Sequence, residues 1–298
     1  MLRAGQILSD GELIDVAAER GRWVSSLPYA SPDMFNGTAG RLRFHLLLWD
    51  EAGDPEHLRH AIEAGEFLLE RAEDAGDGGL HWMTPPDIGG PSSFASLGYA
   101  HGAAGIADAL LDLFEATEDE RFLSTAQGAG QWLVRLAIPV LDDDSGLDWP
   151  HVEGRPPAGA AWCHGATGIG RFFLHAAELG VLPEAADIAV RAARTVARGA
   201  RAQGPTQCHG LAGNIEFLLD MAQATGDRAY LAEARALARL MEAFSTEKAG
   251  ALVWPSDSPD IFSPDYMTGY AGVAMCLLRL SDPEGLPHQL SRSGFRRR

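Results

Sequence analysis

The stretch "AWCHGATGIGRFFLHAA", residues 161–177, places a glycine-rich turn directly before an apolar run with helical periodicity. Its glycines, Gly165 and Gly168, stand three residues apart. Four other segments repeat this G-x-x-G pattern before an apolar run, with first glycines at Gly37, Gly102, Gly210 and Gly269. The spacings between successive first glycines are 65, 63, 45 and 59 residues, and such a recurrence indicates a repeat architecture.

Two further kinds of segment recur between the apolar runs. One kind has the periodicity of an amphipathic helix, with acidic residues near its start and basic residues near its end, as the helix dipole favours. Its copies cover residues 53–72, 117–137, 182–200 and 225–244. The other kind is a short piece that ends at Trp82, Trp149 and Trp254 and predicts a short strand or turn.

These patterns predict an all-α fold in two layers. A helix that is apolar nearly all round must be buried, so the five apolar runs form an inner layer that the amphipathic helices cover. The arrangement that buries all of them is an α/α toroid with the glycine turns at one mouth. We predict one such domain over residues 1–282, followed by a basic tail at 283–298 that contains Arg292 and Arg296–Arg298.

Composition excludes several classes of protein. The net charge of −17 disfavours nucleic acid and anionic membranes as partners, and it leaves open both simple solubility and attraction of a basic partner. Apolar runs of 18 residues are absent, so we expect no membrane span, and the start "MLRAGQILSDGEL" lacks the apolar region of a secretory signal. Three cysteines are too few for a disulfide framework, so we expect a cytoplasmic protein with reduced thiols.

Two of the three cysteines, Cys163 and Cys208, each begin a separate copy of the sequence Cys-His-Gly. At the mouth of the ring, the residues just before the first glycines would gather: Asn36, His101, Cys163, His164, Cys208, His209 and Thr268. Thiolate and imidazole suit Zn²⁺ in tetrahedral geometry, where three protein ligands leave an open catalytic position and four close a structural site. Spacing alone does not choose between His164 and His209 as the imidazole ligand. Cys276 stands in an apolar run and is interpreted as a small buried hydrophobe.

The other histidines have no comparable partners in the sequence. We interpret them as structural or exposed: His45, His57, His60, His81, His151, His175 and His288.

The motifs "GYAHGAAG", "WCHGATG", "CHGLAGN" and "TGYAG", in this order, resemble the lanthionine synthetase C-like family, the LanC cyclases of lanthipeptide biosynthesis. The likeness covers residues from about 30 to 282. It implies an α/α toroid with zinc held by Cys163, Cys208 and His209, and a fourth position for water and then for a substrate thiol. Family members add a peptide cysteine thiolate to dehydroalanine or dehydrobutyrine, which closes a lanthionine or methyllanthionine ring.

The resemblance also implies roles for two residues outside the zinc site. His101 matches the acid/base histidine of the family, and Asp33 matches a motif aspartate that would orient it; the alternative for Asp33 is an N-cap or turn residue. The implied substrate is a dehydrated precursor peptide. Since the sequence has no kinase or lyase motif, a separate dehydratase or kinase/lyase protein must dehydrate that peptide.

The sequence departs from the family in three places. His164 stands where many members have tyrosine, which makes it a further catalytic candidate. The arginine that often precedes this motif is absent from residues 158–161, and Arg155 lies further away. The family ring has more helix pairs than the five visible here, so the chain would be a toroid shortened on its N-terminal side, one completed by another chain, or the cyclase portion of a longer synthetase.

Three other functions stay open. A LanC-like enzyme of this kind would add glutathione to dehydroamino acids in damaged proteins. A scaffold or peptide-binding subunit of a lanthipeptide synthetase would keep a structural zinc ion without catalysis. A zinc prenyltransferase subunit would share the toroid and the activated thiolate, although its ligand pattern differs from the one here.

Overall fold

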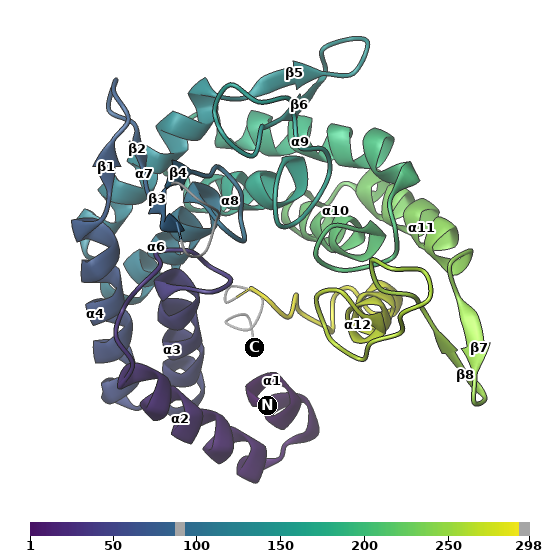
Figure 1. The fold of residues 1–298 in the computed structure, drawn as a ribbon, viewed down its shortest axis with the longest axis horizontal. Coiled ribbons are helices and arrows are strands. Elements are labelled where there is room, and N and C mark those ends of the chain that lie inside the picture. The colour runs from purple at the N-terminus through teal and green to yellow at the C-terminus, as the bar shows by residue number, and fades with distance from the viewer. Residues whose placement is uncertain (87–92, 292–298) are drawn as a thin grey trace. The chain divides into compact units, whose positions relative to one another are not determined.

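The computed structural model describes residues 1–86 and 93–291, and helices dominate these residues (Figure 1). The helices are α1 (Leu2–Leu8), α2 (Gly11–Ser25), α3 (Thr38–Ala52), α4 (Pro55–Glu70), α6 (Ala103–Thr117), α7 (Glu120–Arg135), α8 (Ala166–Leu179), α9 (Ala185–Gly199), α10 (Leu211–Thr225), α11 (Arg228–Glu242) and α12 (Tyr270–Ser281). Every helix in these ranges is too short or too polar to cross a membrane. The prediction of an all-α fold is confirmed.

Within residues 1–86 and 93–291 the strands are short, and each pairs with its neighbour in sequence. They form four antiparallel two-stranded sheets: β1 (Glu73–Asp74) with β2 (Leu80–His81), β3 (Met83–Thr84) with β4 (Phe94–Ala95), β5 (Ile138–Val140) with β6 (Gly146–Asp148), and β7 (Thr246–Lys248) with β8 (Ala251–Val253). Three of these hairpins contain the predicted short pieces before Trp82, Trp149 and Trp254.

The chain divides into two compact units. Unit 1 contains the described residues of Met1–Ser96, His101–Trp132 and Gln289 onward, and unit 2 contains Leu97–Ala100 and Leu133–His288. The single domain over residues 1–282 stays a prediction. Of the predicted basic tail, residues 283–291 include the buried His288 and Ser291, whereas Arg292 and Arg296–Arg298 lie outside the described residues.

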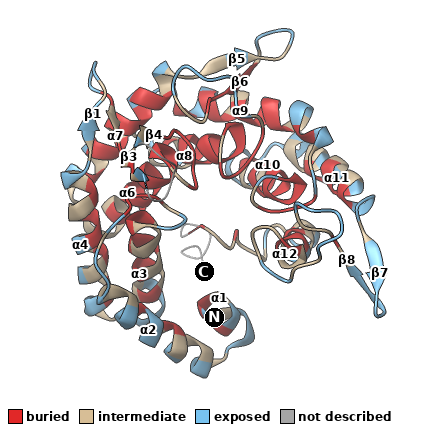
Figure 2. Ribbon diagram, in the orientation of Figure 1, coloured by how far each residue is buried: buried red, intermediate tan, exposed pale blue. Residues whose placement is uncertain are grey.

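All five glycine turns begin a helix at the residue that the sequence indicates. The first glycines, in chain order, are the N-cap residues of α3, α6, α8, α10 and α12. The second glycine permits close packing, since a Cβ atom at Gly168 or Gly213 would clash with a backbone carbonyl of the preceding turn. Helices α6, α8 and α10 are buried over most of their surface, as Figure 2 shows in red.

The predicted amphipathic segments form α4, α7, α9 and α11. Within unit 1, α3 packs against α4 and α6. Within unit 2, α8 packs against α9 and α10, and α10 packs against α11 and α12. In each unit, apolar helices therefore contact one another and amphipathic helices cover them, which is the predicted two-layer order.

A tryptophan after each of three hairpins binds the end of the preceding amphipathic helix. The indole Nε1–H groups of Trp82, Trp149 and Trp254 donate to carbonyl oxygens in the last turns of α4, α7 and α11, at 2.8, 2.7 and 3.0 Å. A regular α-helix leaves the carbonyls of its last turn without intrahelical partners. Each buried indole supplies one such partner and ties the hairpin to the helix.

Candidate functional site

Three glycine turns of unit 2 lie side by side because their backbones are hydrogen-bonded. The N–H of Cys163 donates to the carbonyl of Cys208 at 3.1 Å, and the N–H of Cys208 donates to the carbonyl of Met267 at 2.8 Å. These bonds join the turns before α8, α10 and α12 in that order. Two Cys-His-Gly sequences that stand 45 residues apart are thereby brought into contact.

The side chains of Cys163, Cys208 and His209 form a cluster at these turns, with their ligand atoms all within 4.8 Å of one another. Cys163 is buried, Cys208 is half-buried and His209 is exposed, so the cluster opens toward solvent on one side. Both thiols are free. Two sulfur atoms and one imidazole nitrogen are a donor set that fits Zn²⁺ with one coordination position left open.

Contacts inside the cluster change the pKa values of its members. Hydrogen bonds from Cys208 and His209 lower the pKa of Cys163 against the effect of burial, and His164 contributes in the same direction. The thiolate of Cys163 and burial raise the pKa of Cys208. The pKa of His209 rises to about 9, first because of Cys163 and then because of Asp257. The cluster thus concentrates negative charge on sulfur, which favours a bound cation.

His101 and Asp33, both in unit 1, form a second pair of predicted site residues. The Nδ1 atom of His101 lies 3.4 Å from Oδ2 of Asp33. Asp33 is buried, whereas about a third of the His101 side chain (31%) is exposed. The other carboxylate oxygen of Asp33 accepts the N–H of Asn36 at 2.6 Å. Asp33 therefore closes the turn before α3 and also faces the imidazole, which combines the two interpretations of this residue.

His164 lies outside the three-residue cluster, although it is next to Cys163 in the chain. Its ring packs on that of His151, with centroids 4.1 Å apart. On another side the ring adjoins Gly98, where a Cβ atom would clash with it. The sequence did not distinguish His164 from His209 as the imidazole ligand. Their packing does, because only the side chain of His209 reaches the two sulfur atoms.

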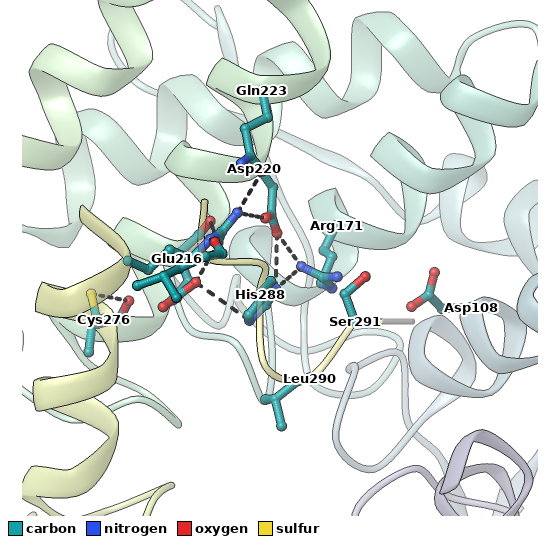
Figure 3. Close-up of polar contacts among 12 residues, drawn as sticks. Asp108, Arg171, Glu216, Asp220, Gln223, Cys276, His288, Leu290 and Ser291 are labelled. Atoms are coloured by element: carbon teal, nitrogen blue, oxygen red, sulfur yellow. Dashed lines mark hydrogen bonds and ion pairs between the residues drawn. The ribbon is translucent and has the colours of Figure 1, made fainter. Parts of the chain in front are cut away.

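A buried group of charged side chains in unit 2 was not predicted from the sequence (Figure 3). Arg279 on α12 forms ion pairs with Glu216 and, at 2.6 Å, with Asp220, both on α10. Arg171 on α8 and His288 also contact Asp220, the latter at 3.1 Å. Burial alone would raise the pKa of Asp220, but the two arginines hold it well below its usual range. The group links the three helices that begin at the site.

The sequence also missed Asp257, which binds His209. The Nε2 atom of His209 lies 2.8 Å from Oδ1 of Asp257. The two residues are 48 positions apart, and no repeated motif includes the loop that carries Asp257. No sequence pattern therefore predicted the contact between Asp257 and His209.

The chain matches known proteins at both the family and the fold level. The family described as lanthionine synthetase C-like protein matches residues 10–290. Among solved structures, nisin cyclase is similar with a TM-score of 0.61 and 17% identity, over 85% of this chain and 64% of that one. A cellobiose 2-epimerase from Bacillus thermoamylovorans B4167 is similar with a TM-score of 0.53 and 16% identity, over 73% of this chain and 62% of that one.

At these identities the structural matches show the fold, and the helical architecture agrees with the predicted α/α toroid. This chain spans 64% of the nisin cyclase chain. The family match extends over nearly all of the sequence and confirms the resemblance that the glycine and cysteine motifs indicate. The chain belongs to the lanthionine synthetase C-like family.

Proposed function

We propose that this protein is a zinc-dependent cyclase that closes thioether rings in a dehydrated precursor peptide. It would join a cysteine thiolate of the peptide to a dehydroalanine or dehydrobutyrine and so form lanthionine or methyllanthionine. The observation that carries the proposal is the cluster of two thiols and one imidazole at adjoining turns. Family membership supports it. We also propose a cytoplasmic setting, which the free thiols suit, and a separate protein that dehydrates the peptide.

Cys163, Cys208 and His209 are the residues that would hold the zinc ion. When bound, zinc lowers the pKa of a substrate thiol so that it reacts as a thiolate near neutral pH. The half-buried and exposed sides of the cluster give a peptide access to it. His164, next to Cys163 in the chain, would lower the pKa of that thiol through its charge.

His101 would act as the proton carrier of the addition. Attack of the thiolate on the β-carbon of the alkene forms the C–S bond and leaves negative charge on the α-carbon and its carbonyl, so the α-carbon needs a proton. The carboxylate of Asp33 lies 3.4 Å from Nδ1 of His101 and can only accept, so it would keep a proton on Nδ1 and orient the ring for proton transfer through Nε2.

Metal content tests the site without an activity assay. We expect elemental mass spectrometry to find one zinc ion per chain in wild-type protein purified without chelators, and none in Cys163→Ala. The matched control is Cys276→Ala, because Cys276 is also buried and belongs to α12. The control should keep its zinc, and zinc-free wild-type protein would overturn the proposal.

Cyclisation itself is tested with a dehydrated peptide that contains one cysteine. Ring closure leaves the peptide mass unchanged but removes the thiol from alkylation, whereas glutathione addition raises the mass. His101→Asn should keep zinc and lose about 100-fold or more in rate, the typical contribution of a general acid or base. A His101→Asn variant that cyclises at the wild-type rate would show that the proton comes from elsewhere.

A further inference from the structure

We propose that Asp257 is a positioning residue that holds His209 in the orientation and tautomer required for metal binding through Nδ1. This inference rests on the proposed zinc site. An imidazole has two nitrogens, and a metal ligand must present one of them without a proton. The hydrogen bond that one nitrogen makes therefore determines which nitrogen binds the metal.

The contacts of His209 decide between the two nitrogens. Its Nε2 atom lies 2.8 Å from the Asp257 carboxylate, which can only accept and therefore keeps the proton on Nε2. The remaining nitrogen, Nδ1, is therefore the one that would give up its proton and present a lone pair to a bound metal. Because the ligand atoms of His209, Cys163 and Cys208 all lie within 4.8 Å, this nitrogen is the one left to complete the donor set.

The loop between β8 and α12 holds the Asp257 carboxylate in place. At its start, the buried indole of Trp254 is bonded to the end of α11. Around Asp257 the chain closes on itself, since the N–H of Ser256 donates to the carbonyl of Ile261 at 2.8 Å and the N–H of Ile261 donates to that of Ser258 at 3.0 Å. The carboxylate therefore meets His209 from a preformed turn.

The bond between Asp257 and His209 contributes little to folding stability. Both side chains are about half exposed, 48% for Asp257 and 44% for His209, and exposed ion pairs stabilise proteins only weakly. A carboxylate that accepts a hydrogen bond from a metal-binding histidine instead increases metal affinity, because it orients the ring and raises the basicity of the ligating nitrogen. Removal of such partners typically weakens metal affinity about 10–100-fold, and the exposure here places the expected effect near 10-fold.

The test is zinc affinity, measured by competition with a chromophoric chelator on purified full-length protein. Asp257→Ala should bind zinc about 10-fold more weakly than wild type. Asp257→Asn should fall between the two, because its amide oxygen still accepts the Nε2–H but lacks the charge. The matched control is Asp260→Ala, which removes an exposed carboxylate from the same loop and should bind zinc like wild type.

The melting temperature of each variant separates a local effect from loss of the fold, and we expect it to be unchanged. An Asp257→Ala variant that binds zinc as tightly as wild type would overturn this inference and leave the proposed cyclase intact. A wild-type protein that binds no zinc would instead overturn the proposed function.

Discussion

Mild acid should destabilise the protein through a buried histidine pair in unit 1. His45 on α3 and His57 on α4 face each other, with their Nδ1 atoms 3.2 Å apart. The other nitrogen of His45, Nε2, lies 2.9 Å from Oγ of Ser25 on α2. Because the Ser25 hydroxyl donates to the carbonyl of Gly21, Nε2 of His45 must donate to Ser25. Its Nδ1 atom then accepts a proton from His57, so the network requires a neutral His45.

The size of the effect follows from the pKa of His45. Burial first, and then His57 and His60, lower this pKa from 6.5 to about 3 in the folded protein. The unfolded chain binds the proton below about pH 6.5 and the folded chain does not, so stability falls with pH between these values. The slope is about 1.4 kcal/mol per pH unit, which gives a loss of about 2 kcal/mol between pH 7 and pH 5.

Urea denaturation of the wild type and of His45→Gln at both pH values measures this loss. The net charge of −17 acts in the opposite direction, because acid reduces repulsion among the carboxylates. Comparison with the variant removes that background, and we expect the wild type to lose about 2 kcal/mol more than His45→Gln. His81→Gln, in the hairpin of unit 1 that follows α4, is the control and should follow the wild type. Equal losses in wild type and His45→Gln would refute the reasoning.

Three further predictions concern the packing of the helices, and urea denaturation measures each of them. Gly168→Ala should lower the free energy of unfolding by about 1–3 kcal/mol, because its Cβ would clash with the backbone. The control Gly199→Ala has open space around its Cβ and should raise the free energy of unfolding by about 0.5 kcal/mol. Equal effects of the two substitutions would contradict the packing argument. Glu216→Gln should lower the free energy of unfolding by about 3 kcal/mol, because it removes one of the negative charges that pair with the buried Arg279. Unchanged stability would refute this. Asp227→Ala should cost about 1 kcal/mol through loss of the N-cap of α11, and unchanged stability would contradict the role of this cap.

The glycine pattern predicted more of this fold than any other feature, for a physical reason. At the second glycine of a turn the helix approaches the preceding backbone so closely that no Cβ fits, and at Gly168 and Gly213 this requirement appears directly in the sequence. The start of every apolar helix could therefore be placed to the residue. The apolar periodicity correctly predicted that α6, α8 and α10 are buried, but α12, which was also predicted to be buried, has an exposed face that includes Leu278.

The candidate site was predicted in part, because a repeated motif identifies the two cysteines but not their neighbours. Adjacent histidines were equivalent in sequence, and only their packing separates them, because His209 reaches the two sulfur atoms whereas the ring of His164 packs on that of His151. Single charges such as Arg279 in an apolar run gave no indication of a partner 63 residues away. Pairs of that kind depend on packing between helices, which periodicity does not encode.

The tryptophan bond at the end of α11 anchors the hairpin of β7 and β8 at its base and leaves its tip exposed. At the hairpin of β7 and β8, Trp254 is anchored to α11, while the tip residues Ala249 and Gly250 are exposed. A segment inserted between these two residues would have its ends already held close together and would interrupt no buried contact. This hairpin is therefore a natural attachment point, where a reporter, a tether to a surface or a fused dehydrating enzyme could be added without disturbing the turns.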